Sequence, residues 1–106
     1  MHKNWGFDTL SIHGSAKHKN PNGALNPPIF MTSTFTFDDV KDAAGIMNFE
    51  REGFIYTRGN NPTLKLFEER MSELEEGEDG VAFASGMGAI SSVLLSLLAP
   101  GDTLVV

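Results

Sequence analysis

The chain contains no cysteine, which excludes disulfide bonds and any reaction step through a thiolate. It has no apolar run of about 18 residues, the length that a membrane-spanning helix needs. Residues 1–7 also lack the apolar segment of a secretory signal. The three histidines, His2, His13 and His18, do not have the spacing of metal ligands, so no metal site is predicted.

Basic side chains are scarce as well. Only 8 lysines and arginines stand against 14 acids, which gives a net charge of -6. This balance argues against nucleic acid or an anionic membrane as the main partner. Together, these absences predict a soluble, cytoplasmic protein.

The length of the chain is that of one small domain. Its 106 residues are 41% hydrophobic, which excludes wholesale disorder. The last residues, DTLVV, have the pattern of a strand in mid-course without a closing turn. We therefore expect the first part of a longer protein.

Residues 1–60 are predicted to form an extended arm and a short helix. Residues 1–35 are rich in glycine, asparagine, proline and serine and show no sustained period of 3.6 or 2. Alternating threonine and phenylalanine within residues 31–37 predicts a short strand or an extended segment. Apolar residues at helical spacing predict a helix within residues 38–50, with Asp38 as its N-cap.

An amphipathic helix is predicted over residues 62–76. Asn61 fits its N-cap, Pro62 fits its first position, and Gly77 fits its C-terminal stop. Apolar residues recur along one face at the period of a helix. The charged residues on the other face are predicted to be solvated and to have no catalytic role.

Residues 61–106 are predicted to open an α/β domain. Residues 81–84 and 103–106 are short apolar runs typical of buried strands, and a glycine turn at 85–88 and a helix at 89–98 lie between them. Strand, helix and strand in this order predict a βαβ unit with parallel strands and a right-handed crossover.

The glycine turn of this unit is a candidate anion site. The first backbone N–H groups of a helix have no internal acceptor, and the helix dipole favours negative charge there. Gly86 and Gly88 would let a phosphate approach the backbone, and Ser85 would offer a hydroxyl or cap the helix. Three interpretations stay open: phosphate binding, a turn that is only sharp, and a dinucleotide fingerprint, GMGAIS, with Ser91 in place of its third glycine.

A second candidate anion site lies in YTRGNNPT, residues 56–63. In an extended segment, Tyr56 and Arg58 project to the same side because side chains alternate with a period of two. They would offer a phenol and a guanidinium fork to one phosphate or carboxylate. On this pair alone, an ordinary solvated edge is the simpler interpretation.

Four stretches together carry a family resemblance. NPPIFMTSTFTF, YTRGNNPT, LEEGEDGVAFASGMGAI and LLAPGDTLVV occur in this order over most of the chain. The sequence resembles the pyridoxal-phosphate enzymes of Cys/Met metabolism, the group of cystathionine gamma-synthase, cystathionine gamma-lyase, methionine gamma-lyase and O-acetylhomoserine sulfhydrylase. The resemblance implies a fold-type-I PLP-dependent transferase-like α/β fold, with the N-terminal arm and the first βαβ unit of the large domain in this chain.

The resemblance also implies pyridoxal 5'-phosphate as the cofactor and a role for each matching residue. In this family the arm wraps around a neighbouring subunit, so Tyr56 and Arg58 would contact the cofactor phosphate in that neighbour's active site. The backbone amides of Gly86 and Met87, with Ser85 beside them, would bind the phosphate within their own subunit. A homo-oligomer is implied, namely a dimer with shared active sites that assembles into a tetramer.

The implied activity is γ-elimination or γ-replacement on a sulfur-containing or homoserine-derived amino acid. The residues leading into YTRGNNPT look slightly more like methionine gamma-lyase and the sulfhydrylases than like the synthases. The Schiff-base lysine would lie beyond Val106, so the chain alone is expected to be inactive and to contain no catalytic residue. Two alternatives from other classes stay open: a nucleotide-binding oxidoreductase domain and a non-catalytic fragment.

Overall fold

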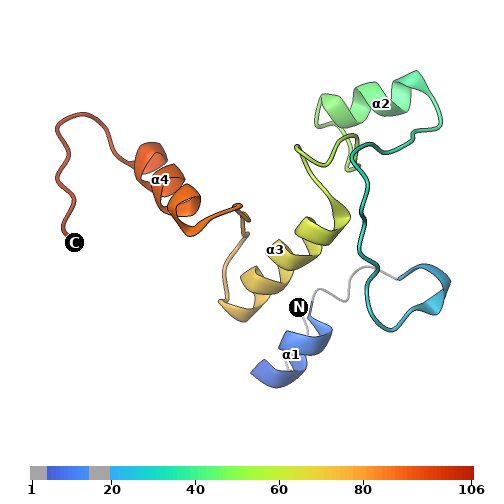
Figure 1. Ribbon diagram of the computed structural model, residues 1–106, viewed down its shortest axis with the longest axis horizontal. Helices are drawn as coiled ribbons and strands as arrows, with labels where there is room; N and C mark the ends of the chain where they lie inside the picture. Colours follow the sequence, from blue (N-terminus) through green and yellow to red (C-terminus); the bar gives the residue numbers. More distant parts are fainter. Residues whose placement is uncertain (1–4, 15–19) are drawn as a thin grey trace.

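The computed structural model describes residues 5–14 and 20–106, and the predictions for His2 and His18 lie outside these ranges. The described residues form helices and one short 3-10 helix, with no strand among them (Figure 1). The bounds are α1 Phe7–His13, η1 Pro21–Gly23, α2 Val40–Met47, α3 Pro62–Leu74 and α4 Gly86–Leu97.

Helix α1 lies in the stretch predicted as an extended arm, so that prediction is wrong for residues 7–13. A helix of 7 residues is marginal by itself. It lies beside α3 in Figure 1, where Arg70 of α3 donates a hydrogen bond to the carbonyl of Gly14 at 3.1 Å. Gly14 is buried, and a Cβ there would lie 2.4 Å from the carbonyl oxygen of Leu10. Contact with α3, rather than local periodicity, therefore explains α1.

Residues 31–37 are confirmed as an extended segment. An antiparallel bridge joins Thr34 to Tyr56. The flanking backbone bonds run from Phe35 N–H to the carbonyl of Ile55 at 3.0 Å and from Thr57 N–H to the carbonyl of Ser33 at 2.8 Å. The arm is thus fastened directly to the YTRGNNPT stretch.

Helix α2 confirms the predicted short helix, but its N-cap lies one residue later than predicted. The side chain of Asp39, not of Asp38, accepts a hydrogen bond from Asp42 N–H at 2.8 Å. After the helix, Phe49 takes a left-handed φ of 58°. The chain then runs back toward the arm and reaches α3.

Helix α3 begins as predicted. Asn61 caps it by accepting a hydrogen bond from Thr63 N–H at 2.8 Å, and Pro62 occupies the first turn, where its missing N–H costs nothing. The prediction that its charged face is only solvated is wrong for Glu68. The carboxylate of Glu68 accepts a hydrogen bond from Ala82 N–H at 2.7 Å and so fixes the chain that leads to α4.

The C-terminal stop of α3 differs in detail from the prediction. Glu76, not Gly77, takes the left-handed conformation, with a φ of 55°. Gly77 N–H donates to the carbonyl of Ser72 at 2.8 Å, which is the long bond of a Schellman turn. Gly77 therefore closes the turn from the position after the left-handed residue.

Helix α4 begins at Gly86 rather than at Ala89, so residues 85–88 form its first turn and not a separate tight turn. Ser85 caps the helix by accepting a hydrogen bond from Gly88 N–H at 3.1 Å. Residues 81–84 and 103–106 pair with no strand in the described part of the chain. A parallel strand needs hydrogen-bonded neighbours, and none is present here, so only the helix of the predicted βαβ unit is confirmed.

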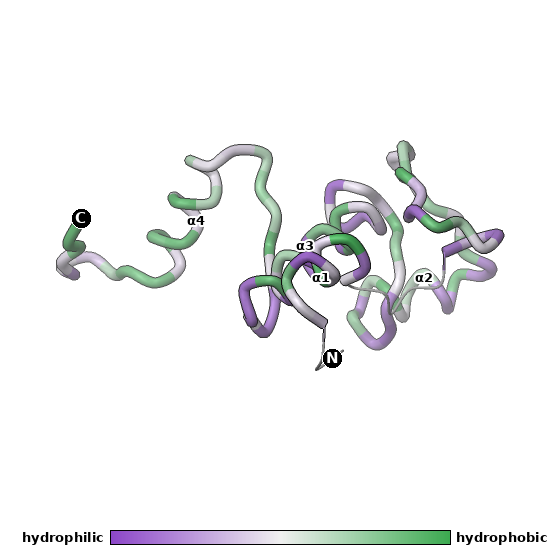
Figure 2. Tube along the Cα trace, turned by 90° about the horizontal axis from the view of Figure 1, so that it is seen from below, coloured by the Kyte–Doolittle hydropathy of each residue, from purple (hydrophilic) through white to green (hydrophobic). Residues whose placement is uncertain are grey.

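The described residues form no core of their own. None of their apolar side chains is buried, and the Cα radius of gyration is 17.1 Å, against about 13 Å for a compact domain of this length. Helix α4 stands apart from α1 to α3 in Figures 1 and 2, and much of its length is apolar. Within the described part, no helix combines the length and apolarity of a membrane span. The apolar faces of these helices therefore stay largely uncovered by the other described residues.

Candidate phosphate-binding site

Tyr56 and Arg58 come together through a turn. Tyr56 lies in the bridge to the arm, and residues 57–59 form a turn that Gly59 N–H closes on the carbonyl of Tyr56 at 2.9 Å. The guanidinium carbon of Arg58 lies 5.2 Å from the centroid of the Tyr56 ring. The prediction that the two side chains share a side is confirmed, but the prediction that an extended segment places them there is wrong.

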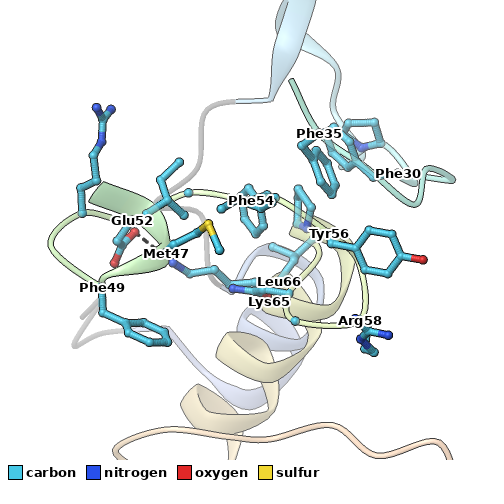
Figure 3. A pocket seen from close by; sticks show the side chains of 18 of the residues that line it. Phe30, Phe35, Met47, Phe49, Glu52, Phe54, Tyr56, Arg58, Lys65 and Leu66 are labelled. Carbon is cyan, nitrogen blue, oxygen red and sulfur yellow. Dashed lines mark hydrogen bonds and ion pairs between the residues drawn. The ribbon is translucent and has the colours of Figure 1, made fainter. Parts of the chain in front are cut away.

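The head groups of both side chains are available to a ligand. Both residues are exposed, and Figure 3 shows the Tyr56 hydroxyl and the Arg58 guanidinium pointing away from the surrounding side chains. No carboxylate in residues 5–14 or 20–106 forms an ion pair with Arg58. A free guanidinium fork is suited to bidentate binding of a phosphate or carboxylate.

An open cavity of about 1290 Å³ adjoins the turn, between the end of α2, residues 49–60 and the start of α3 (Figure 3). Phe35 and Phe54 line it, with ring centroids 5.5 Å apart. Tyr56 and Arg58 also belong to its lining. Apolar walls beside an unpaired cation suit a group that is apolar at one end and anionic at the other.

Asn61 holds the turn at residues 57–59 in place through its buried side chain. The residue is 3% exposed, and its side chain contacts three segments at once. Its Oδ1 caps α3, while its Nδ2 donates to the carbonyl of Phe30 at 3.1 Å and to the hydroxyl of Thr57 at 3.0 Å. The sequence predicts only the cap. The residue type is the one sequence feature that could have indicated the two donated bonds, because asparagine carries amide donors that the other common capping residues lack.

The N-terminus of α4 is the second place where an anion could bind. The hydroxyl of Ser85 accepts a hydrogen bond from Gly88 N–H. No acceptor in the described residues contacts the N–H groups of Gly86 and Met87. A Cβ added at Gly86 would meet no atom within 4 Å, so the backbone there is open to a ligand. These N–H groups lie at the positive end of the helix dipole.

The structure does not bring the two candidate groups together. In Figures 1 and 2, α4 lies well away from the turn at residues 57–59, which directly precedes α3. The cavity beside that turn has none of residues 85–87 in its lining. Within one chain, Tyr56 and Arg58 therefore do not reach an anion that is bound at the N-terminus of α4. The described residues also contain no group of three or more potential metal ligands.

Comparison with known families and curated proteins gives close matches. Residues 8–106 match the family model described as Cys/Met metabolism PLP-dependent enzyme. L-methionine gamma-lyase of Pseudomonas deceptionensis is 53% identical over 105 residues, which are 99% of this chain and 26% of that protein. O-succinylhomoserine sulfhydrylase of Pseudomonas aeruginosa is 40% identical over 100 residues, 94% of this chain and 25% of that protein. The chain thus spans about a quarter of the length of these relatives.

Solved structures match as well. The crystal structure of a Campylobacter jejuni protein assigned as an O-acetylhomoserine (thiol)-lyase contains N'-pyridoxyl-lysine-5'-monophosphate. It has a TM-score of 0.84 and 32% identity, and the match covers 93% of this chain and 24% of that one. Cystathionine gamma synthase of Xanthomonas oryzae pv. oryzae, in complex with aminoacrylate and cysteine, has a TM-score of 0.75 and 36% identity, over 92% and 23% of the two chains.

Proposed function

Because this chain belongs to the Cys/Met metabolism family of PLP-dependent enzymes, we propose that it is the N-terminal part of an enzyme that acts on a sulfur-containing or homoserine-derived amino acid. The reaction is γ-elimination or γ-replacement. The observation that carries this proposal is the family match over residues 8–106, together with 53% identity to an L-methionine gamma-lyase. Identity to the sulfhydrylases is lower, at 40% and 38%, so the lyase reaction is favoured. The family match leaves the nucleotide-binding oxidoreductase alternative without support.

The residues present fit the phosphate of pyridoxal 5'-phosphate. The N–H groups of Gly86 and Met87 are unpartnered in the described residues and lie beside open space, and Arg58 has no ion-pair partner there. A helix N-terminus alone contributes about 0.3–2 kcal/mol toward binding an anion. The charge-assisted bonds of a guanidinium add to this, so the two groups complement each other on a dianion.

The two sets of phosphate ligands come from different subunits in this proposal, because they lie far apart within one chain. Gly86 and Met87, with Ser85 as the cap that holds their helix turn, bind the phosphate in their own subunit. Tyr56 and Arg58 reach the same phosphate from a neighbouring subunit of a homo-oligomer. This arrangement is supported by the distance of α4 from the Tyr56–Arg58 turn within one chain (Figures 1 and 2).

Pyridoxal phosphate, when bound, supplies an electron sink that stabilises negative charge on the carbon atoms of the substrate. The role of this chain is to bind and orient the cofactor through its phosphate. Residues 1–60 form the part that contacts the neighbour, and residues 61–106 begin the cofactor-binding domain. In the complete protein, residues 81–84 and 103–106 become parallel strands of that domain, because its other strands supply the missing partners.

The reaction is tested on the complete protein, loaded with pyridoxal phosphate. With L-methionine as the only substrate, we expect release of a thiol, measured with a thiol-reactive dye, together with a 2-oxo acid and ammonia. A protein that consumes an O-acylhomoserine with sulfide but leaves methionine intact would be a sulfhydrylase, which contradicts the favoured reaction. A protein that acts on neither substrate and binds no pyridoxal phosphate would contradict the whole proposal.

A further inference from the structure

Thr57 lies between Tyr56 and Arg58, but its side chain forms hydrogen bonds within the chain instead of pointing outward. Its hydroxyl accepts a hydrogen bond from Asn61 Nδ2 at 3.0 Å and donates one to the carbonyl of Thr32 in the arm. Its backbone N–H donates to the carbonyl of Ser33 at 2.8 Å. Thr57, the first residue of the turn, is thus bonded to the arm at two points and to Asn61 at a third.

Asn61 is unusual because it is a buried polar side chain in a chain whose described apolar side chains are all at least partly exposed. Its side-chain amide makes three hydrogen bonds, to the arm at Phe30, to the turn at Thr57 and to the start of α3 at Thr63. Both Nδ2 protons and one lone pair of Oδ1 are used, which fixes the orientation of the amide. A buried amide that bonds to three segments at once holds those segments in one arrangement.

These contacts set the position of the two exposed head groups without touching them. Thr57 and Asn61 bond to the arm and to each other, while the head groups of Tyr56 and Arg58 point away from the surrounding side chains (Figure 3). If the hydroxyl of Thr57 were lost, the turn would keep its Gly59 closure but lose its side-chain fastening to the arm. The direction of Arg58 would then be less well defined.

We propose that Thr57 and Asn61 are positioning residues, which hold the Tyr56–Arg58 turn against the arm so that its two head groups meet the cofactor phosphate. This inference rests on the proposed function. It adds a role for two residues that do not contact the phosphate themselves.

The test uses the complete protein with its cofactor removed and then titrated back. Thr57→Val keeps the shape of the side chain but removes the hydroxyl. We expect the dissociation constant for pyridoxal phosphate to rise by about three- to tenfold, because a less well oriented Arg58 would lose about the worth of one hydrogen bond to the phosphate. Thr57→Ser keeps the hydroxyl and should restore binding. Asn61→Asp keeps the helix cap but loses the amide donors, so it should weaken binding in the same direction as Thr57→Val.

A matched control and a double variant separate positioning from general stability. Among the described residues, the Thr32 hydroxyl bonds only to the carbonyl of Thr34 at 2.9 Å. Thr32→Val removes this hydroxyl and keeps the backbone carbonyl that Thr57 uses, so it should leave cofactor affinity unchanged. Thr57→Val acts through Arg58 in this proposal, so its effect on affinity should largely disappear in an Arg58→Ala background. Equal fold losses in both backgrounds, or full affinity in Thr57→Val and Asn61→Asp, would overturn the inference.

The same measurements also test the proposed function separately. If Arg58→Ala alone leaves the cofactor affinity unchanged, the assignment of Arg58 to the phosphate fails, whatever Thr57→Val does. If Arg58→Ala weakens binding and Thr57→Val does not, only the positioning role fails.

Discussion

Arg58 and Tyr56 share one turn but offer different interactions to an anion. Arg58 carries a permanent charge and has no ion-pair partner among the described residues. Tyr56 offers a neutral hydroxyl, and its ring lies 5.2 Å from the guanidinium carbon. Such a cation–π contact is worth about 0.5–1 kcal/mol at an exposed site. Removing the Tyr56 hydroxyl leaves this ring support in place, so its loss should be the smaller one.

We therefore predict that Arg58→Ala weakens cofactor binding more than Tyr56→Phe does in the complete protein. Two charge-assisted bonds to phosphate are worth about 3 kcal/mol or more, so Arg58→Ala should raise the dissociation constant roughly a hundredfold. Tyr56→Phe removes one hydrogen bond to the charged phosphate, worth about 1.5 kcal/mol, and should raise it about tenfold. Titration of the cofactor-free variants, followed by absorbance, measures both. Equal or reversed losses would refute the ranking.

The same residues show how far a sequence predicts single positions. Asn61 is predictable as a cap because its acceptor serves Thr63, only two residues away. Its bonds to Thr57 and Phe30 depend on how the arm packs, and the bond to Phe30 spans 31 positions. No local pattern carries that information. The nearness of Tyr56 and Arg58 was predictable from their spacing, but the turn that produces it was not.

At the scale of elements, those with local causes are predictable and the others are not. Helix α3 has a cap, a proline and a regular apolar period, and its start is where the sequence predicts it. Helix α1 depends on its contact with α3 through Arg70 and Gly14, so its short sequence gives no signal. Residues 81–84 and 103–106 have the composition of strands but need neighbours that the described chain does not contain.

The free N–H groups at the start of α4 allow a prediction about cofactor binding. Gly86 is the first residue of α4, and a side chain there has space. Proline is favoured at this position and removes the N–H, whereas alanine keeps it. In the complete protein, Gly86→Pro should weaken cofactor binding by about ten- to a hundredfold, the worth of one hydrogen bond to a charged group, while the thermal midpoint of the cofactor-free protein stays unchanged. Gly86→Ala is the control for bulk. If alanine weakens binding as much as proline, the backbone donor is not what the phosphate uses.

At the scale of the whole molecule, the exposed apolar surface and the divided site have one explanation. The described chain buries no apolar side chain, and α4 stands apart with Ile90 and Leu97 52% and 76% exposed (Figure 2). Surfaces of this kind become buried in a larger domain or between subunits. In the proposed arrangement, the Tyr56–Arg58 turn of one chain then serves the N-terminus of α4 in its neighbour. A symmetric dimer would contain two such sites, each built from both chains.

Mixed oligomers test this arrangement directly. When Arg58→Ala and Gly86→Pro chains of the complete protein are combined, each mixed dimer should have one site with both defects and one site with neither. With random pairing at equal amounts, about a quarter of the wild-type sites should return, measured as thiol release at limiting cofactor. Arg58→Ala combined with Tyr56→Phe is the matched control. Both of its defects lie in the same turn, so every mixed site keeps one of them and no fully intact site returns. If each site instead belonged to a single chain, the first mixture would show only the mean activity of its two separate variants, as the control mixture should, because every chain would carry its own defect into its own site.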